Sequence, residues 1–209
     1  MSDLTSYLLA TRRLLHDASG QFWQDSELTD YINEARNRVA IDSGCLRQLQ
    51  SFALVAGQEV YPFTALPLGA MTFDIINVTV IWGNSRYLMG YMPYTQFTSW
   101  ARAWTSYVDM PSVFSVYGQN SFYIGPSPSQ AYACEFDTII LPNVLVNAST
   151  VEQIVYPYTG AVQYYAAYLA KEKEQMYTES DRFMKEYENK LRAALRASYT
   201  RRIPLGQRR

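Results

Sequence analysis

Glu135 and Asp137 are the residues whose type and spacing best suit catalysis in this 209-residue chain. One residue apart on a predicted strand, the two carboxylates share a face at a separation of about 6.6 Å, which lies in the range that glycosidase carboxylate pairs use. The neighbouring Cys134 and Phe136 belong to the opposite face, which is also the default pattern of a strand with one solvated face. We favour the solvated strand and keep a small glycan hydrolase as an alternative function.

Other residues that carry chemistry are too few to form a familiar site. His16 is the only histidine, and its place near the end of the first predicted helix suits a favourable charge at a helix C-terminus. Cys45 and Cys134 show no CxxC or Cys/His spacing and are expected to be reduced thiols. No GxSxG elbow is present, and no lysine precedes Lys171, which excludes a Walker-type phosphate loop. The sequence therefore predicts no enzyme, no cofactor and no metal.

Aromatic residues are unusually frequent, with 18 Tyr, 9 Phe and 4 Trp. Tyrosine combines an apolar ring with a polar tip and suits surfaces that become buried against other subunits. One cluster comprises Tyr91, Tyr94, Phe97, Trp100, Trp104 and Tyr107. A sugar platform or a base-stacking surface is the alternative, but only Arg102 lies among these rings and stacking on single strands calls for interleaved cations. We therefore expect Tyr91, Tyr94 and Trp100 to lie in a protein interface.

The net charge of −1 is the sum of a negatively charged body and a positively charged tail. Six arginines and no acid follow position 190, namely Arg192, Arg196, Arg201, Arg202, Arg208 and Arg209. Twelve basic and nineteen acidic residues precede them, so the tail carries +6 and the body −7. Ile203, Pro204 and Leu205 lie between two arginine pairs, and such an apolar segment suits a groove on a protein. Protein docking is favoured, with a basic-tailed nucleic-acid binder as the alternative.

Helical periodicity marks both ends of the chain. One helix is expected up to about residue 18 and a second over about 26–42, followed by Gly44, a residue type that ends helices in the left-handed conformation. The apolar stripe of the second helix is Leu28, Ile32, Ala35 and Val39. Two further helices are expected after Pro157, the last one reaching about Ser198. A helix with an apolar stripe on one side must bury that stripe against another element. The four helices are therefore predicted to form one bundle.

Strand periodicity fills the middle of the chain. A hairpin is predicted from Phe52 to Phe63, followed by a strand over 73–82, a Gly-Asn turn and a return over 86–91. A short helix is predicted over 93–104, and three strands over 112–117, 121–124 and 132–141. The predicted fold is α+β, mainly a helical bundle (1–48 and 150–198) with a β-rich insertion (49–149) and an extended basic C-terminal docking tail (199–209). The apolar run over 75–82 is too short to cross a membrane.

Several strings resemble tailed-phage head-to-tail adaptor proteins. Residues 23–36 read W-x-D-x-E-L-x-x-Y-I-N-E-A-R, and GCLR follows at 44–47. VYPF, PSVF, YIGPSPS and YYAAYLA then appear in the same order as in that family. The similarity covers nearly the whole chain in layout, although these strings are packing motifs.

The resemblance implies a structural virion protein that forms a ring, usually of twelve copies, beneath the portal of short-tailed phages. Such a ring joins the portal to tail (nozzle or hub) proteins and extends the DNA channel, with DNA passing through the lumen without specific binding. It implies assembly in the virion neck after synthesis in the host cytoplasm, with no membrane partner. The C-terminal segment, from Arg192 to Arg209, is the implied portal-docking element. Tyr91, Tyr94 and Trp100 are then expected to face ring neighbours or tail proteins.

Overall fold

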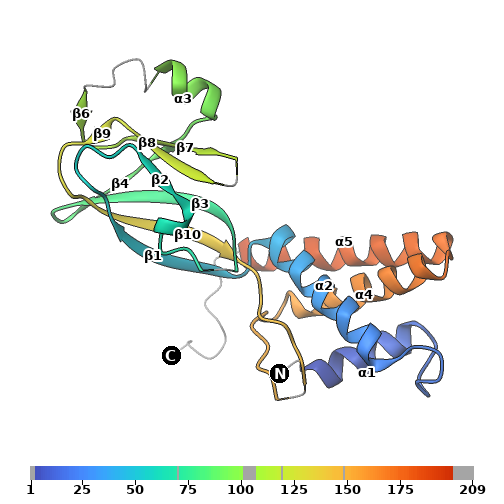
Figure 1. Cartoon of the computed structure of the whole chain (residues 1–209). Coiled ribbons are helices and arrows are strands. Elements are labelled where there is room, and N and C mark those ends of the chain that lie inside the picture. Colours follow the sequence, from blue (N-terminus) through green and yellow to red (C-terminus); the bar gives the residue numbers. More distant parts are fainter. Residues whose placement is uncertain (1–2, 70, 101–106, 119, 148, 200–209) are drawn as a thin grey trace. The chain divides into compact units, whose positions relative to one another are not determined.

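The computed structural model shows a mixed α+β protein, which confirms the α+β part of the predicted fold (Figure 1). It describes residues 3–69, 71–100, 107–118, 120–147 and 149–199. The chain divides into two compact units, one formed by residues 1–46 and 141–209 and the other by residues 47–140. We call these the helical unit and the β unit and describe each by itself.

The helical unit contains four long helices that come from both ends of the chain. They are α1 (Leu4–Leu14), α2 (Asp25–Ser43), α4 (Thr159–Lys173) and α5 (Tyr177–Tyr199). Asp3 caps α1, because its carboxylate accepts the backbone N–H of Ser6 at 2.7 Å. Gly44 adopts φ 58° immediately after α2, so the predicted left-handed stop is confirmed.

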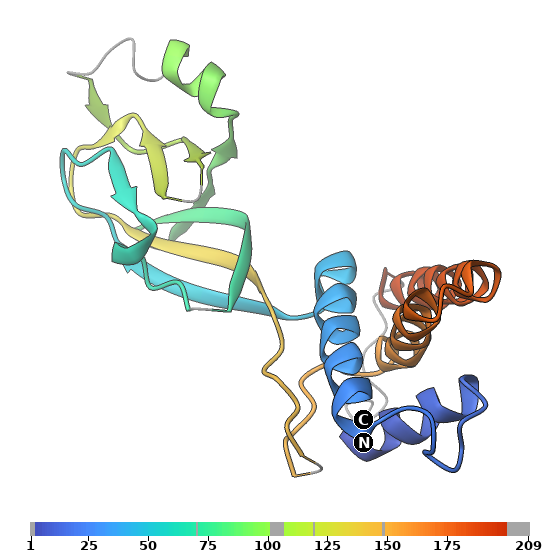
Figure 2. The same cartoon turned by 45° about the vertical axis from the view of Figure 1, so that its right-hand side comes forward.

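Small and apolar side chains build the core of the helical unit. The predicted stripe of α2 is fully buried, and α4 packs beside α5 (Figure 2). Four alanines of α4 are buried against the other helices, namely Ala161, Ala166, Ala167 and Ala170. Their short side chains let neighbouring helices approach closely. Tyr187, Leu191 and Ala194 supply the facing stripe of α5.

The β unit contains two four-stranded sheets and one two-stranded sheet. The first sheet has the order β1 (Arg47–Ala53), β10 (Ala133–Ile140), β3 (Thr72–Trp82), β4 (Ser85–Leu88). The second has the order β2 (Val60–Pro62), β8 (Ser121–Gly125), β7 (Val113–Tyr117), β5 (Gly90–Tyr91). The smaller sheet pairs β6 (Val108–Asp109) with β9 (Ser127–Pro128), and α3 (Tyr94–Trp100) and a 3-10 turn, η1 (Phe63–Ala65), complete the unit.

A core of aromatic and branched residues fills the space between the two larger sheets. Val78, Val80 and Phe136 face it from the first sheet, and Phe122 faces it from the second. The rings of Phe122 and Phe136 meet edge to face, with centroids 5.3 Å apart. Alternate residues on each strand point away from this core, which is the usual arrangement when two sheets pack face to face.

The predicted hairpin from Phe52 to Phe63 is wrong. The strand β1 pairs with β10, whereas β2 pairs with β8 in the other sheet. The rings of Phe52 and Tyr61 still meet, 5.4 Å apart, because both face the same core. The alternation of apolar residues therefore indicated correctly that both strands face one core. It did not show that they are hydrogen-bonded neighbours.

The segment after the last strand packs with the helices. The strand β10 ends at Ile140, and the fully buried side chain of Leu145 joins the core of the helical unit. Residues 141–149, which the sequence grouped with the β-rich insertion, therefore lie in the helical unit. The predicted short helix is present as α3 over Tyr94–Trp100, and the remainder of its predicted range, 101–104, lies outside the described residues.

Asp17 organises the connection between α1 and α2. Its carboxylate accepts the backbone N–H groups of Gln21, Phe22 and Trp23 at 3.0, 3.2 and 3.0 Å, and it pairs with the buried Arg12 at 2.8 Å. The hydrogen bond from Trp23, followed by those from Phe22 and Gln21 and by the charge of Arg12, lowers the pKa of Asp17 below its ordinary value of 3.8.

We predict that Asp17→Asn lowers the melting temperature at pH 7, because an amide has one acceptor oxygen and no charge to offer these donors. A depressed pKa in the folded state contributes stability above the unfolded pKa, and this contribution is lost as pH falls through the folded pKa. The advantage of the wild type should therefore shrink as the pH falls below 3.8, which thermal melts from pH 7 to pH 2 would measure. A constant gap over that range would contradict the assignment.

Candidate assembly surfaces

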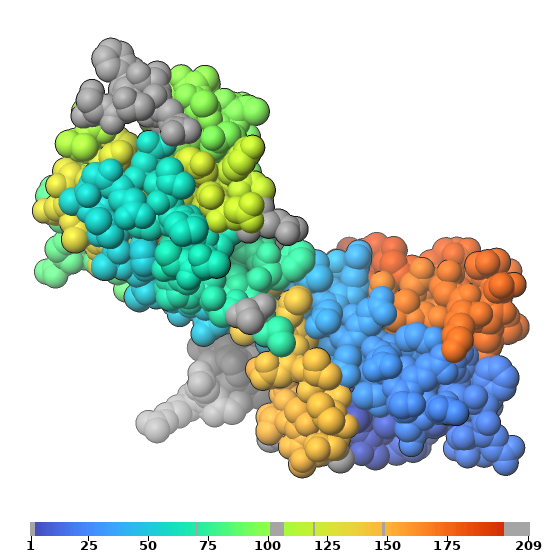
Figure 3. Space-filling view, in the orientation of Figure 1, coloured from blue at the N-terminus to red at the C-terminus, as the bar shows by residue number. Residues whose placement is uncertain are grey.

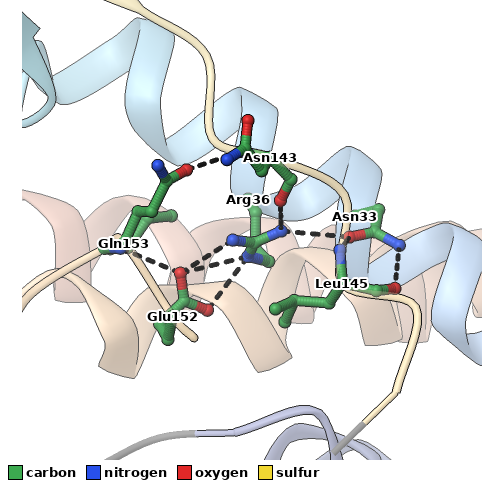
Figure 4. A network of polar contacts seen from close by, with 7 residues as sticks. Asn33, Arg36, Asn143, Leu145, Glu152 and Gln153 are labelled. Carbon is green, nitrogen blue, oxygen red and sulfur yellow. Dashed lines mark hydrogen bonds and ion pairs between the residues drawn. The ribbon is translucent and has the colours of Figure 1, made fainter. Parts of the chain in front are cut away.

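A buried arginine fastens the segment 141–156 to α2 (Figure 4). The guanidinium of Arg36 donates to both carboxylate oxygens of Glu152, at 2.8 Å from Nη2 and 2.9 Å from Nε. Its Nη1 donates to the backbone carbonyl of Asn143 at 2.7 Å and to the side-chain oxygen of Asn33 at 3.0 Å. All three nitrogens of this side chain thus donate to partners, as a buried charge requires.

Asn33 adds a second attachment one turn away on α2. Its amide nitrogen donates to the carbonyl of Leu145 at 3.0 Å, and its amide oxygen accepts the backbone N–H of Leu145 at 2.8 Å. Gln153 closes the segment on itself by accepting the backbone N–H of Asn143 at 2.6 Å. Irregular backbone needs such partners for its polar groups, because it has no ladder to satisfy them. We call this group of contacts the Arg36 network.

The segment held by the Arg36 network exposes apolar side chains on its outer side. These are Val144, Val146, Val151, Val155 and Tyr156, the last with 88% of its surface exposed. In the space-filling view the segment, coloured amber, lies against the blue surface of the N-terminal helices (Figure 3). Sequence reasoning missed this surface, and the only signal was the spacing of valines in a stretch without helical or strand periodicity.

Glu135 and Asp137 share the outer face of the first sheet, as expected, and both are bound by arginines. Arg86 on β4 pairs with Glu135. Arg47 on β1 pairs with Asp137, with Nε 3.0 Å from Oδ1. Asn77 on β3 also lies near Asp137, at 3.4 Å. Asp137 is thus paired with the neighbouring strand β1, and Glu135 with β4 on the far side of β3, which favours the solvated-strand interpretation.

The three aromatic residues predicted for an interface differ in their surroundings. Tyr91 and Trp100 expose 62% and 56% of their surfaces. Tyr94 instead packs within the β unit, where its ring lies 4.3 Å from Tyr117 and 5.1 Å from Tyr123. Tyr91 and Trp100 are therefore available to a partner, whereas Tyr94 also holds α3 against the second sheet.

The basic tail is described only at its beginning. Arg192 and Arg196 lie exposed on α5. The other predicted docking residues, Arg201, Arg202, Ile203, Pro204, Leu205, Arg208 and Arg209, lie outside the described residues. Their docking role stays a prediction.

The described residues can be compared with the requirements of a metal cluster and of a membrane-spanning helix. Among them, no three side chains of His, Cys, Asp or Glu come together as a metal would require. No helix in the described ranges combines the length and the apolar character needed to cross a bilayer.

A family model described as SU10 adaptor protein matches residues 2–208. The chain belongs to this family of phage head-to-tail adaptors. The resemblance noted from its packing motifs is thereby confirmed. No curated protein matches the chain. As a member of this family the adaptor has a structural role in the virion neck, where it associates with portal and tail components.

The Arg36 network yields a quantitative prediction for the adaptor. Arg36→Met leaves the charge of Glu152 buried with no cation beside it, only the backbone N–H of Ile154, and should lower the free energy of unfolding by about 3–5 kcal/mol. The double variant Arg36→Met/Glu152→Leu removes both charges and should recover most of that loss, because the desolvation cost disappears with them. Urea unfolding followed by circular dichroism would measure both values.

A matched control is Arg38→Met on the same helix. Arg38 pairs with Asp42 at 2.9 Å but is half exposed, so this substitution should change the free energy of unfolding by less than about 1 kcal/mol. Equal losses for Arg36→Met and Arg38→Met would contradict the assigned role of the network.

Proposed function

We propose that this chain forms a ring, with twelve copies as its expected number, beneath the portal and joins the portal to the tail. The family match over residues 2–208 is the observation that carries the proposal. DNA passes through the lumen of this ring without specific binding, and the role is structural rather than enzymatic. The ion-paired state of Glu135 and Asp137 supports the structural role over the glycan hydrolase.

The C-terminal part of the chain is proposed to dock on the portal. Arg192 and Arg196 are exposed on the last turns of α5, which leads directly into residues 200–209. Arginine is favoured at desolvated protein interfaces because its planar guanidinium can bind carboxylates through two hydrogen bonds. Ile203, Pro204 and Leu205 would add an apolar contact between the arginine pairs.

The β unit is proposed to contact ring neighbours or tail proteins. Residues 43–151 contain only three arginines and five acids, and several large apolar side chains of the β unit are exposed. Each subunit of a ring needs two different faces that fit one another, since its contacts are heterologous. A surface poor in charge and rich in aromatic residues suits such contacts.

Truncation after Ser198 tests the docking tail. The shortened chain should keep the melting temperature of the full chain, because the described cores are built from residues that precede Tyr199, and it should lose binding to the portal protein of the same phage. Binding is measured by biolayer interferometry on immobilised portal.

Two substitution sets in the full chain serve as controls for the truncation. Ile203→Ser with Leu205→Ser removes the apolar contact, and Arg201→Ala with Arg202→Ala removes charge. Portal binding of native strength by the truncated chain would refute the docking role. Binding of duplex DNA that is lost on truncation and falls steeply with salt would support the nucleic-acid alternative instead.

Trp100→Ala tests the exposed aromatic surface. Truncation of a tryptophan that is buried at the centre of an interface can cost about 2 kcal/mol or more, and a ring repeats that loss at every interface. We expect Trp100→Ala to reduce the yield of portal-bound rings, seen by negative-stain electron microscopy, while the melting temperature of the free subunit is unchanged.

Tyr94→Ala is the matched comparison and should lower the melting temperature as well, because its ring packs on Tyr117 and Tyr123. If Trp100→Ala unfolds the subunit to the same extent, Trp100 belongs to the core and the interface lies elsewhere.

A further inference from the structure

The first sheet of the β unit has two open edges within the part of the chain that the structure describes. Its order is β1-β10-β3-β4, so β1 has a partner only in β10 and β4 only in β3 (Figure 1). The open strands span seven residues in β1 and four in β4. Edge strands carry rows of unpaired backbone N–H and C=O groups, which can pair with another chain.

The hydrogen-bond pattern identifies which residues point outward at each edge. The N–H of Leu54 donates to the carbonyl of Tyr132 at 2.8 Å, in register with the β1–β10 ladder. In antiparallel pairs the bonded positions alternate, so the backbone groups of Leu49 and Ser51 point away from β10.

The same argument applies at the opposite edge. The N–H of Met89 donates to the carbonyl of Val78 at 2.8 Å, in register with the β3–β4 ladder. By alternation, the backbone groups of Arg86 and Leu88 point away from β3. Each edge thus presents free donors and acceptors at every second residue.

Neither edge carries the usual protection against strand addition. The sequences RQLQSFA and SRYL contain no proline, and both ladders run without a bulge. The single charge on each edge is Arg47 or Arg86, and each is ion-paired to a carboxylate of β10. Proteins commonly discourage edge pairing by proline, bulges or free charges.

The two edges also match one another in the apolar residue that each exposes. Leu49 and Leu88 are 64% and 67% exposed, although both are strand residues. The pairs Leu49–Asp137 and Thr79–Leu88 place both leucines on the face of the sheet that carries Glu135 and Asp137. If the sheet continued from β4 into another β1, the two leucines would lie side by side on one face.

We propose that β4 of one copy pairs antiparallel with β1 of the next copy, with Leu88 opposite Leu49 and Arg86 opposite Ser51. The sheet is antiparallel throughout and has an even number of strands, so an added copy continues the alternation of strand direction. The two edges differ, so the contact is head-to-tail and generates a ring or an open filament, not a closed dimer. This inference rests on the proposed ring function and names its subunit contact.

The small size of the β4–β1 contact indicates that it forms only when neighbouring copies are held together. Four residues of β4 can pair, which is much less than the 20–30 residues a side that a typical stable interface engages. The pairing therefore needs a template that holds neighbouring copies in place, and the portal supplies it in the proposed function. Free subunits are accordingly expected to remain monomeric.

Cysteine cross-linking on the portal tests the register. Paired residues at bonded positions have Cα atoms about 5.5 Å apart, within the range that a disulfide spans. The variant Leu49→Cys/Leu88→Cys, in a Cys45→Ser background, should give a ladder of covalent multimers on mild oxidation of adaptor–portal complexes. Leu49→Cys/Ser85→Cys is the matched control, because Ser85 lies on the same strand but faces the other side of the sheet. It should give no ladder.

A proline substitution tests the edge without cross-linking. Ser51→Pro removes an outward N–H and leaves the ladder to β10 intact, so the free subunit should keep its melting temperature and lose ring formation on the portal. Ser51→Thr keeps the N–H and should assemble normally.

The outcomes separate this contact from the ring itself. Complete rings that show no ladder, or normal ring assembly by Ser51→Pro, would overturn the strand pairing and leave the proposed ring standing. A covalent dimer from Leu49→Cys alone would show pairing of two β1 strands and would also overturn it. If the wild-type chain forms no ring on the portal, both the ring and this contact fail.

Discussion

The buried guanidinium of Arg36 is the interaction on which the helical unit depends. That unit is assembled from two stretches of chain, residues 1–46 and 141–209, with the entire β unit inserted between them. Arg36 joins the stretches by binding Glu152 and the carbonyl of Asn143, and so fixes where the chain returns. Burying its charge costs free energy. Hydrogen bonds to these partners offset that cost and fix the position of the returning segment. The core around Leu145 and Ile154 then closes over the same segment.

The surfaces of the two units follow different physical rules. In the helical unit the polar groups of irregular backbone are bound, and apolar side chains such as Tyr156 remain on the outside. In the first sheet of the β unit the arginines of both edge strands are paired, Arg47 with Asp137 and Arg86 with Glu135, which leaves little net charge at the edges of the sheet. Both arrangements satisfy the internal needs of a subunit and leave apolar surface uncovered, as a component that functions in contact with neighbours requires.

The sequence predicted the features that depend on short-range periodicity. The stripe of α2 and the stop at Gly44 follow from helix geometry, and β3 with its Gly-Asn turn follows from strand alternation. The partner of β1 could not be predicted, because Phe52 alternates in the same way whichever strand lies beside it. The Arg36 network could not be predicted either, since Arg36 and Glu152 are 116 positions apart and the segment around Glu152 has no period. Trp100 and Tyr94 belong to the same aromatic cluster of the sequence. Only the structure shows that Trp100 is exposed and that Tyr94 is packed.

The helical unit consists of two separate stretches of chain, so its parts leave the ribosome at different times. The β unit is continuous in sequence and can fold as soon as residue 140 has emerged. The helices α1 and α2 are made first, yet their apolar stripe is covered only when α4 and α5 arrive. Leu28, Ile32 and Val39 therefore remain without these packing partners while most of the chain is translated. The helical unit is therefore completed only at the end of translation, after the β unit.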